Sequence, residues 1–402
     1  MFTIEGQIVN IDAISRGRIE IDPATGLIVK VGEPTGKADI VLDQELIFPG
    51  FVDLHVHARE CAAHSQDYKE DFTTAGQAAI NGGVVAFAEM PNNTTPPVDD
   101  ASYEEKLLLA KKSSAEVVLY AGLGPATKPL AKKVPYKVYM GKSVGDLFFI
   151  DFETLDKALE NYKGQQVSFH AEDPKILADN SNQSSHELKR PPEAENSAVD
   201  FALKMIEKYK LQGRICHLST KAGLEKIIKA KKSGISVTCE VAPHHLYYDV
   251  SAKLQMNPPL RAKEDCLALI EGLRNGDIDF LATDHAPHTI EDKQKGASGL
   301  PLLDTYGPFI TWLMQQHQFT PEDIARVCSF NPGNFISQFT AHQYGRIKEG
   351  FAGSLTVIDP NRPIKIEKLM LKTKCGWSPF EGIIFPGSVK YTIIKGKICK
   401  GN

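Results

Sequence analysis

Eight short apolar runs that alternate with stretches of helical periodicity constrain the fold of this chain of 402 residues more than any other feature. The runs are rich in β-branched and aromatic residues, which favours buried strands. They lie at 51–56, 84–89, 116–120, 136–140, 167–171, 214–218, 236–242 and 279–283. Helices are predicted between most of them, at 71–81, 101–113, 153–162, 197–209, 221–232 and 264–274; the helical pattern is weakest between the third and fourth runs. This alternation predicts the α/β class and a (β/α)₈ barrel (a TIM barrel) over residues 48–346.

Both ends of the chain have a different pattern. Residues 1–47 contain short alternating runs separated by Gly, Pro and Asp, which is typical of β-hairpins. Strand-like runs return after Ile347. Because these β-rich ends flank a single barrel, we expect residues 1–47 and 347–402 to form one small β-sandwich domain together.

The first predicted barrel strand ends in a His-x-His pair within FPGFVDLHVHAR, residues 48–59. Side chains alternate between the two faces of a strand, so we expect Asp53, His55, His57 and Arg59 to share one face. Two imidazoles on one face can bind one metal ion, and Arg59 can bind an anion beside it. A His-rich strand end without a ligand is the alternative for this motif taken alone.

Further polar side chains recur where the other predicted strands end. Catalytic residues of such barrels come from the C-terminal ends of different strands. Any one of these histidines could be structural, but their joint placement favours a metal site. The residues are Asn92 after the second strand, Lys137 in the fourth, His170 and His217 at the ends of the fifth and sixth, and Asp284 and His288 after the eighth.

Lys137 is unusual because it lies within an apolar strand. Burial lowers the pKa of an amine, and a neutral amine can react with carbon dioxide to form a carbamate that bridges two metal ions. The sequence equally allows a lysine whose stem lies in the barrel wall while its amine reaches solvent.

Asp284 lies in ATDHAPH, where a carboxylate beside a metal can bind the ion and also act as a general base. The alternative is a turn or helix-capping residue. Asn257 belongs to a loop, NPPLR, that we expect near the barrel mouth. His285 is given no role, and for His244 and His245 packing is favoured over ligation.

Composition limits the classes of partner. A formal net charge of −4 with 24% charged residues gives no argument for nucleic acid or an acidic membrane surface. We find no apolar run of about 18 residues and no signal-peptide pattern. The seven scattered cysteines include no CxxC pair, which favours reduced thiols and a cytoplasmic protein.

Nine motifs together resemble the dihydroorotases of the amidohydrolase superfamily, most closely the dihydroorotase domain of the animal multifunctional pyrimidine protein. The motifs are FVDLHVHARE, AEMPNNTTPP, YKVYM, FHAED, ICHLS, CEVAPHHL, NPPLR, ATDHAPH and WSPFEG. The resemblance implies zinc-dependent, reversible cyclisation of N-carbamoyl-L-aspartate to L-dihydroorotate, in the de novo synthesis of pyrimidines (UMP).

The resemblance also implies a ligand set. Two Zn²⁺ ions per chain would be bridged by a carboxylated Lys137 and a hydroxide. His55, His57 and Asp284 would bind one ion, and His170 and His217 the other, with Asp284 as the catalytic base. Residues that match the family's substrate positions are Arg59, Asn92, Asn257 and His288. A homodimer and an association with aspartate transcarbamoylase are further expectations.

Two segments depart from the family pattern. The family usually has Arg-Glu-Pro-Gly after the metal-binding strand, whereas here Cys61-Ala62 follows Glu60. The loop after the lysine strand has Lys142-Ser143-Val144-Gly145 in place of a Thr-Phe pair. These departures leave two alternatives open: a related cyclic amidohydrolase, such as a hydantoinase (dihydropyrimidinase) or allantoinase, and a catalytically silent scaffold.

Overall fold

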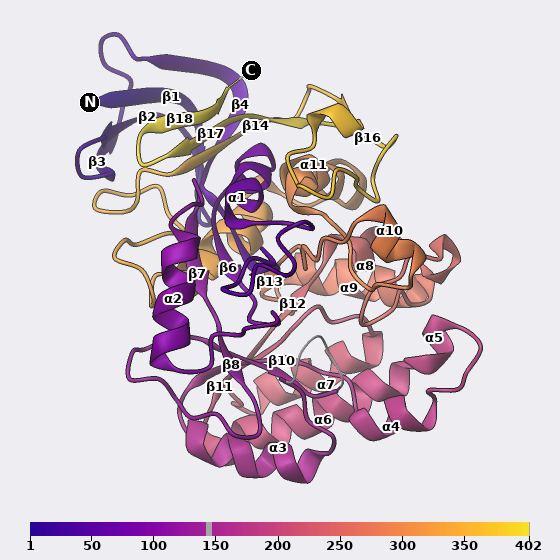
Figure 1. Cartoon of the computed structure of the whole chain (residues 1–402). Helices are drawn as coiled ribbons and strands as arrows, with labels where there is room; N and C mark the ends of the chain where they lie inside the picture. Colours follow the sequence, from indigo (N-terminus) through magenta and orange to yellow (C-terminus); the bar gives the residue numbers. More distant parts are fainter. Residues whose placement is uncertain (142–146, 402) are drawn as a thin grey trace.

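The computed structural model describes residues 1–141 and 147–401, so the loop at 142–145 lies outside the described residues. Nine parallel strand segments form the predicted barrel (Figure 1). They are β5 (Phe51–Val56), β6 (Val84–Glu89), β7 (Glu116–Leu119), β8 (Ala121–Leu123), β9 (Tyr136–Tyr139), β10 (Gln166–His170), β11 (Gln212–Ile215), β12 (Val237–Val241) and β13 (Phe280–Leu281).

The predicted run at 116–120 is divided at Tyr120 into β7 and β8. β7 pairs with β6 and β8 pairs with β9, so these two segments together occupy one strand position of the barrel. The last gap is closed by a parallel bridge between Val56 and His285. The predicted (β/α)₈ barrel is therefore confirmed.

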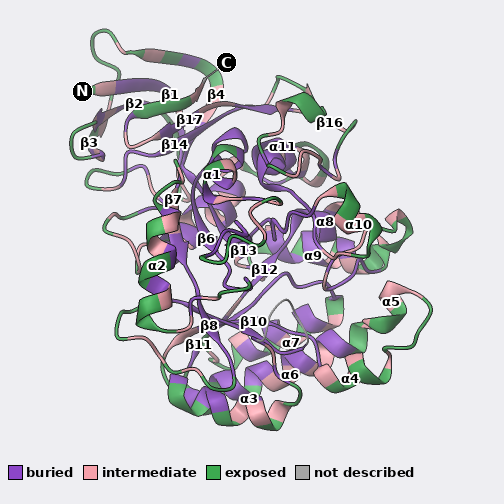
Figure 2. Cartoon of the chain, in the orientation of Figure 1, coloured by how far each residue is buried: buried purple, intermediate pink, exposed green. Residues whose placement is uncertain are grey.

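Helices surround the barrel, with buried inner faces and exposed outer faces (Figure 2). The predicted helices correspond to α1 (Phe72–Asn81), α2 (Asp100–Ala110), α3 (Phe152–Leu159), α6 (Pro192–Tyr209), α7 (Lys221–Lys232) and α9 (Lys263–Asn275). Asp71, Asp99 and Asp151 cap the first three of these helices. Each carboxylate accepts a hydrogen bond from the backbone N–H three residues further along the chain. As the weak pattern indicated, residues 124–135 contain no helix.

Several helices were not predicted. Most are too short to show a full helical period: α4 (Pro174–Asp179), α5 (His186–Lys189), α8 (Pro243–Tyr247), α10 (Ile290–Gln294), α12 (Pro321–Ala325) and α13 (Asn331–Ile336). A longer one, α11 (Tyr306–His317), is buried over most of its surface and so lacks an amphipathic pattern.

The two chain ends form one seven-stranded sheet in the order β18-β17-β14-β4-β1-β2-β3. Its strands are β1 (Phe2–Val9), β2 (Ile14–Asp22), β3 (Leu27–Gly32), β4 (Ile40–Pro49), β14 (Leu355–Asp359), β17 (Ser388–Ile394) and β18 (Lys397–Gly401). Only the pair β1–β4 in this sheet is parallel. The antiparallel pairing of β4 with β14 joins the N-terminal and C-terminal parts, which confirms a small β-domain built from both termini.

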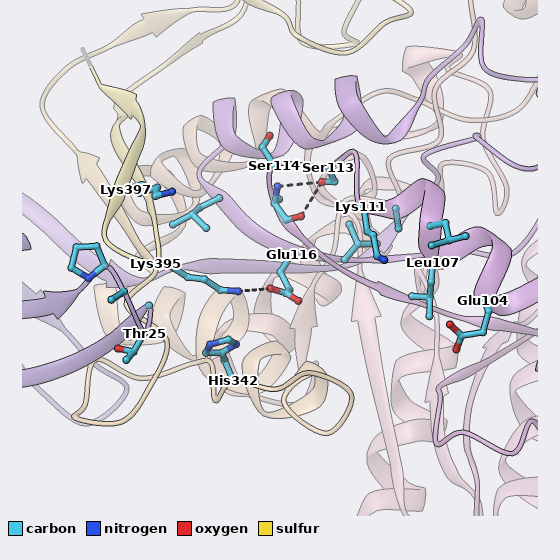
Figure 3. Close-up of a pocket in the computed structure, with 18 residues that line it drawn as sticks. Thr25, Glu104, Leu107, Lys111, Ser113, Ser114, Glu116, His342, Lys395 and Lys397 are labelled. Atoms are coloured by element: carbon cyan, nitrogen blue, oxygen red, sulfur yellow. Dashed lines mark hydrogen bonds and ion pairs between the residues drawn. The ribbon is translucent and has the colours of Figure 1, made fainter.

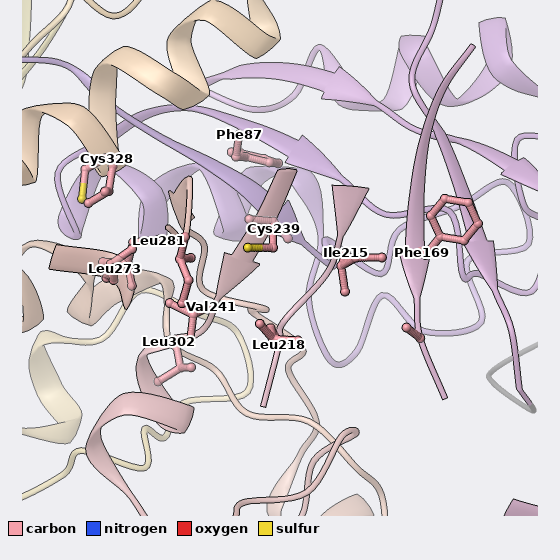
Figure 4. Close-up of a cluster of buried hydrophobic side chains, with 14 of the residues drawn as sticks. Phe87, Phe169, Ile215, Leu218, Cys239, Val241, Leu273, Leu281, Leu302 and Cys328 are labelled. Carbon is pink, nitrogen blue, oxygen red and sulfur yellow. The ribbon is translucent and has the colours of Figure 1, made fainter. Parts of the chain in front are cut away.

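Apolar side chains of the barrel strands pack in one large buried cluster, and a smaller cluster joins β5 and β6 to α13. Ile215, Val241 and Leu281 from neighbouring strands belong to the same buried cluster as Leu273 of α9 (Figure 4). Burying a side chain of this size stabilises the fold by about 1.5–3 kcal/mol. Because this core fixes the strands, their C-terminal ends become rigid supports for polar groups.

Candidate active site

A cavity of about 320 Å³ lies at the C-terminal end of the barrel. Every site residue predicted from the sequence lines it except Lys137. These residues are His55, His57, Arg59, Asn92, His170, His217, Asn257, Asp284 and His288. The predicted residues therefore converge on one cavity although they come from six strands and loops.

A larger cavity, of about 710 Å³, lies where α2 and β7 approach the terminal sheet (Figure 3). Its charged groups include Lys395, which forms an ion pair with Glu116 at 2.9 Å. The single histidine that lines it is His342, and no cluster of three metal-binding side chains from the described residues lies there. Chemistry of the predicted kind therefore belongs to the smaller cavity.

His55, His57 and Asp284 form the first half of the site. Asp284 Oδ1 lies 3.3 Å from His55 Nε2 and 3.4 Å from His57 Nε2. The other ring nitrogens donate outward, from His55 Nδ1 to Glu240 and from His57 Nδ1 to Asn92 Oδ1 at 2.5 Å. Both Nε2 lone pairs and the carboxylate therefore face the same point, which is how a metal site is arranged.

His170 and His217 form the second half. His170 Nδ1 lies 2.9 Å from His217 Nε2, while His170 Nε2 donates to Glu172 at 2.8 Å. His217 Nδ1 is buried and has no hydrogen-bond partner among the described residues. This second pair of imidazoles also points ring nitrogens at one another inside the cavity.

Burial keeps the histidines neutral. It lowers the pKa of His55 to about 3, with the nearby Lys137 ammonium as the next cause. For the same first reason the pKa values of His57 and His217 lie well below their usual range. Burial also raises the pKa of Asp284 well above that of an exposed carboxyl. Neutral imidazole is the form that binds a metal ion.

Lys137 lies in β9 behind the cavity and is completely buried. Its Nζ donates to Cys216 Sγ at 2.9 Å, and its charge contributes to lowering the pKa values of His55 and His217. The alternative in which this amine reaches solvent is therefore wrong.

Arg59 enters the cavity for a reason other than the one expected from strand alternation. The strand β5 ends at Val56, and the backbone of Arg59 is left-handed, with a φ of 61°. The Asp53 carboxylate, also expected on this face, accepts the Thr283 backbone N–H at 3.1 Å and does not line the cavity. For Arg59, strand alternation was therefore the wrong basis for the prediction, because the chain turns after Val56.

The Arg59 guanidinium is buried without a counter-ion. Its Nε donates to Pro287 O at 3.3 Å and its Nη2 lies 3.2 Å from His288 Nε2. It forms no ion pair with a carboxylate in the part of the chain that the structure describes. Burial, followed by the charges of Arg59 and Lys69, lowers the pKa of His288 to about 2. A buried cation beside a neutral imidazole and the unpaired Asn257 Oδ1 is suited to an anionic, polar ligand.

Two buried carboxylates at the site were missed from the sequence, Glu172 and Glu240. Each contacts a predicted ligand, His170 and His55 respectively. Their position beside the strand ends, in FHAED and CEVAP, was the available signal, because a buried carboxylate needs a partner.

Three further buried histidines, His244, His245 and His285, do not line the cavity. His244 and His245 are buried outside the cavity, and His245 Nε2 donates to Pro258 O at 3.0 Å, which fits the favoured packing role. His285 Nδ1 accepts the backbone N–H of Leu302 at 3.1 Å. Glu60, directly before the departing residues, accepts the Phe72 N–H at 3.0 Å at the start of α1 and does not line the cavity.

Comparisons with known proteins agree with this geometry. The model of the amidohydrolase family matches residues 46–399. A dihydroorotase of Thermococcus kodakarensis is 34% identical over 99% of this chain and 92% of its own length. A dihydroorotase of Bacillus pumilus is 31% identical over 89% of this chain and 88% of its own length. These matches confirm the resemblance drawn from the sequence motifs.

Solved structures agree on the fold. An L-hydantoinase from Arthrobacter aurescens superposes with a TM-score of 0.91, covering 100% of this chain and 96% of its own, at 23% sequence identity. A D-hydantoinase superposes with a TM-score of 0.86 at 23% identity, covering 100% and 95%. At these identities the likeness establishes the barrel architecture.

Proposed function

This chain belongs to the amidohydrolase family and is a cyclic amide hydrolase, and we propose that it is a zinc-dependent dihydroorotase. The reaction would be the reversible ring closure of N-carbamoyl-L-aspartate to L-dihydroorotate in pyrimidine synthesis. The observation that carries this substrate is the buried Arg59, which forms no ion pair with a carboxylate among the described residues and lies beside the histidines of the cavity. Dihydroorotate has both groups that such a site would recognise, a ring amide and a carboxylate.

The donor groups fit two metal ions. His55, His57 and Asp284 would hold one ion, since their lone pairs face one point. His170 and His217 would hold the other. When bound, the two zinc ions would lower the pKa of water and polarise the amide carbonyl.

Lys137 is proposed to carry a carboxylate that bridges the two ions. Its amine is fully buried, its contact is a neutral thiol, and its charge acts on the histidines of both halves. A buried ammonium beside two cations would be strongly unfavourable, whereas a carbamate supplies an anion there.

Asp284 is proposed as the general base. In ring opening it accepts a proton from the attacking water and passes it to the leaving ring nitrogen. In ring closure it removes the proton from the carbamoyl nitrogen. Arg59 can bind the substrate carboxylate through two parallel hydrogen bonds, while Asn92, Asn257 and His288 fix the ring orientation. Such positioning supplies several kcal/mol, because ring closure requires the reacting atoms to be aligned.

The test is a parallel assay of the purified, zinc-loaded protein. Ring opening of dihydroorotate, hydantoin and allantoin is followed in the ultraviolet at equal concentrations. We expect kcat/KM to be highest for dihydroorotate. A preference for hydantoin or allantoin would assign a related cyclic amidohydrolase, and no turnover of any of the three would favour a silent scaffold.

The remaining expectations stay predictions. A homodimer, an association with aspartate transcarbamoylase and a cytoplasmic location are proposed from the sequence and its resemblance. Among the residues that the structure describes, no helix has the length and apolar character needed to cross a membrane.

A further inference from the structure

The second pair of histidines is supported by buried and half-buried charged side chains that the proposed reaction does not use. Glu172 is completely buried and accepts a hydrogen bond from His170 Nε2 at 2.8 Å. Arg190 meets the same carboxylate with two donors, Nε to Oε1 at 2.9 Å and Nη2 to Oε2. This is a bidentate ion pair, so both carboxylate oxygens are fixed in place.

The same support continues to the other histidine. Arg261 donates from Nη1 to the backbone oxygen of Arg190 at 2.8 Å and from Nε to Ser219 Oγ at 3.0 Å. Ser219 lies two residues beyond His217 and also donates to the buried Glu195. The segments that follow β10 and β11 are therefore tied together through two arginines.

The charges fix which nitrogen of His170 is free. Arg190 donates to both carboxylate oxygens of Glu172, so this side chain is a paired carboxylate that accepts hydrogen bonds from its neighbours. An ionised carboxylate only accepts, so the proton of His170 is on Nε2 and the lone pair is on Nδ1. Nδ1 is the atom that faces His217.

We propose that Glu172 and Arg190 are positioning residues that set the zinc affinity of the His170–His217 half of the site without touching the ion. The inference rests on the two-ion site of the proposed function. The other half is supported by Asn92 and Glu240, and neither of these is hydrogen-bonded to Glu172 or Arg190, although Glu240 also accepts the backbone N–H of His217 at 3.3 Å. Loss of a hydrogen-bonded partner behind a ligating histidine typically costs 10–100-fold in metal affinity. Only one of the two ions is therefore expected to be affected.

The experiment is a titration of the zinc-loaded full chain with a chromophoric chelator. Wild type is expected to release about two zinc ions per chain. Glu172→Gln keeps the shape and removes the charge, and one ion is expected to leave at 10–100-fold lower chelator strength while the other is unchanged. Glu187→Gln is the matched control, because it removes a carboxylate from the short helix α5, which ends next to Arg190, and the Glu187 side chain forms no hydrogen bond or ion pair with His170. It should behave as wild type.

A second variant keeps the inference testable if Glu172→Gln does not fold. Arg190→Met leaves Glu172 in place and should weaken the same ion, while Arg190→Lys should recover part of the affinity. Thermal unfolding of the metal-free proteins separates positioning from a general loss of structure.

The outcomes are distinct. Release curves of Glu172→Gln and Arg190→Met that match wild type, or that shift both ions equally, would overturn the inference and leave the proposed function intact. A wild-type protein that binds no zinc would overturn both.

Discussion

Burial lowers the pKa of both kinds of nitrogen base in this site, but it changes the charge of only one of them. The imidazoles of His55, His57 and His217 become neutral, because burial lowers a pKa that is ordinarily near neutrality. It lowers the pKa of Arg59 as well, but a guanidinium starts so high that it stays charged. One cavity is therefore lined both by neutral imidazoles and by a permanent cation.

Replacing Arg59 tests whether that cation binds the substrate carboxylate. Arg59→Met keeps the length of the side chain and removes both donors. Loss of a charge-assisted bidentate pair with a desolvated partner costs about 2–4 kcal/mol. We expect kcat/KM for dihydroorotate to fall by roughly 30- to 1,000-fold, since each 1.36 kcal/mol is tenfold.

The controls for Arg59→Met are zinc content and turnover of unsubstituted hydantoin, neither of which involves the carboxylate. Both should be nearly unchanged. Undiminished turnover of dihydroorotate would show that Arg59 is not the anchor, and would remove the main substrate argument.

At the scale of elements, the sequence predicted the strands whose positions depend on the local pattern of side chains. β5 and β6 agree with the predicted runs to the residue, because buried strands concentrate β-branched and aromatic side chains. The residues that line the cavity were predicted by the rule that catalytic groups lie at the strand ends. Pattern could not show the turn at Arg59 or the division at Tyr120, since both depend on neighbouring strands.

The supports of the ligands were beyond prediction for a related reason. Glu240 contacts His55 across 185 positions of sequence, and Arg190 is placed against Glu172 by the short helix α5. Such contacts exist only once the barrel closes. Sequence spacing therefore identified the residues that line the cavity but not the side chains that orient them.

One segment after the barrel, residues 372–378, connects the C-terminal part of the chain with the active-site loops. Trp377 Nε1 donates to His288 O at 2.7 Å. Lys374 N donates to Glu70 at 3.2 Å, and Thr373 Oγ1 donates to the same carboxylate. The WSPFEG motif thus holds the backbone that carries His288.

Trp377→Phe should weaken substrate binding without affecting the metal. The change keeps an aromatic ring and removes one hydrogen bond, worth about 1 kcal/mol. We expect KM for dihydroorotate to rise about fivefold with kcat nearly constant. Trp312→Phe, at the other tryptophan of the chain, is the control, since Trp312 packs against Tyr247 in α8 and contacts no site residue. Equal KM values for the two variants would argue against a positioning role for Trp377.

At the scale of the whole molecule, the barrel and the terminal sheet share one continuous piece of chain. β4 ends at Pro49 and β5 begins at Phe51, so Gly50 alone separates the sheet from the strand that carries His55. Its N–H donates to Ser354 O at 2.8 Å, which ties the joint to the C-terminal part of the sheet. The metal-binding strand is therefore anchored at its start by both chain ends.

This joint has no room for a side chain at Gly50. A Cβ there would lie 2.3 Å from Val85 Cγ2 and 3.0 Å from Ser354 O. Gly50→Ala should therefore destabilise the protein by about 1–3 kcal/mol, the usual cost of overpacking a core. The free energy of unfolding is measured by denaturant titration with two probes, tryptophan fluorescence and far-ultraviolet circular dichroism.

Gly32→Ala is the matched control, because Gly32 ends β3 in the same sheet and a Cβ there would meet its nearest atom, Lys30 Cε, at 4.0 Å. Its stability should equal or slightly exceed that of wild type, since alanine loses less backbone entropy on folding. If the sheet and the barrel unfold as one unit, both probes should shift together in Gly50→Ala. If Gly50→Ala has the same free energy of unfolding as Gly32→Ala, Val85 and β14 can move to make room for the methyl group without loss of stability. The close approach at Gly50 would then not be needed to hold β5 in place.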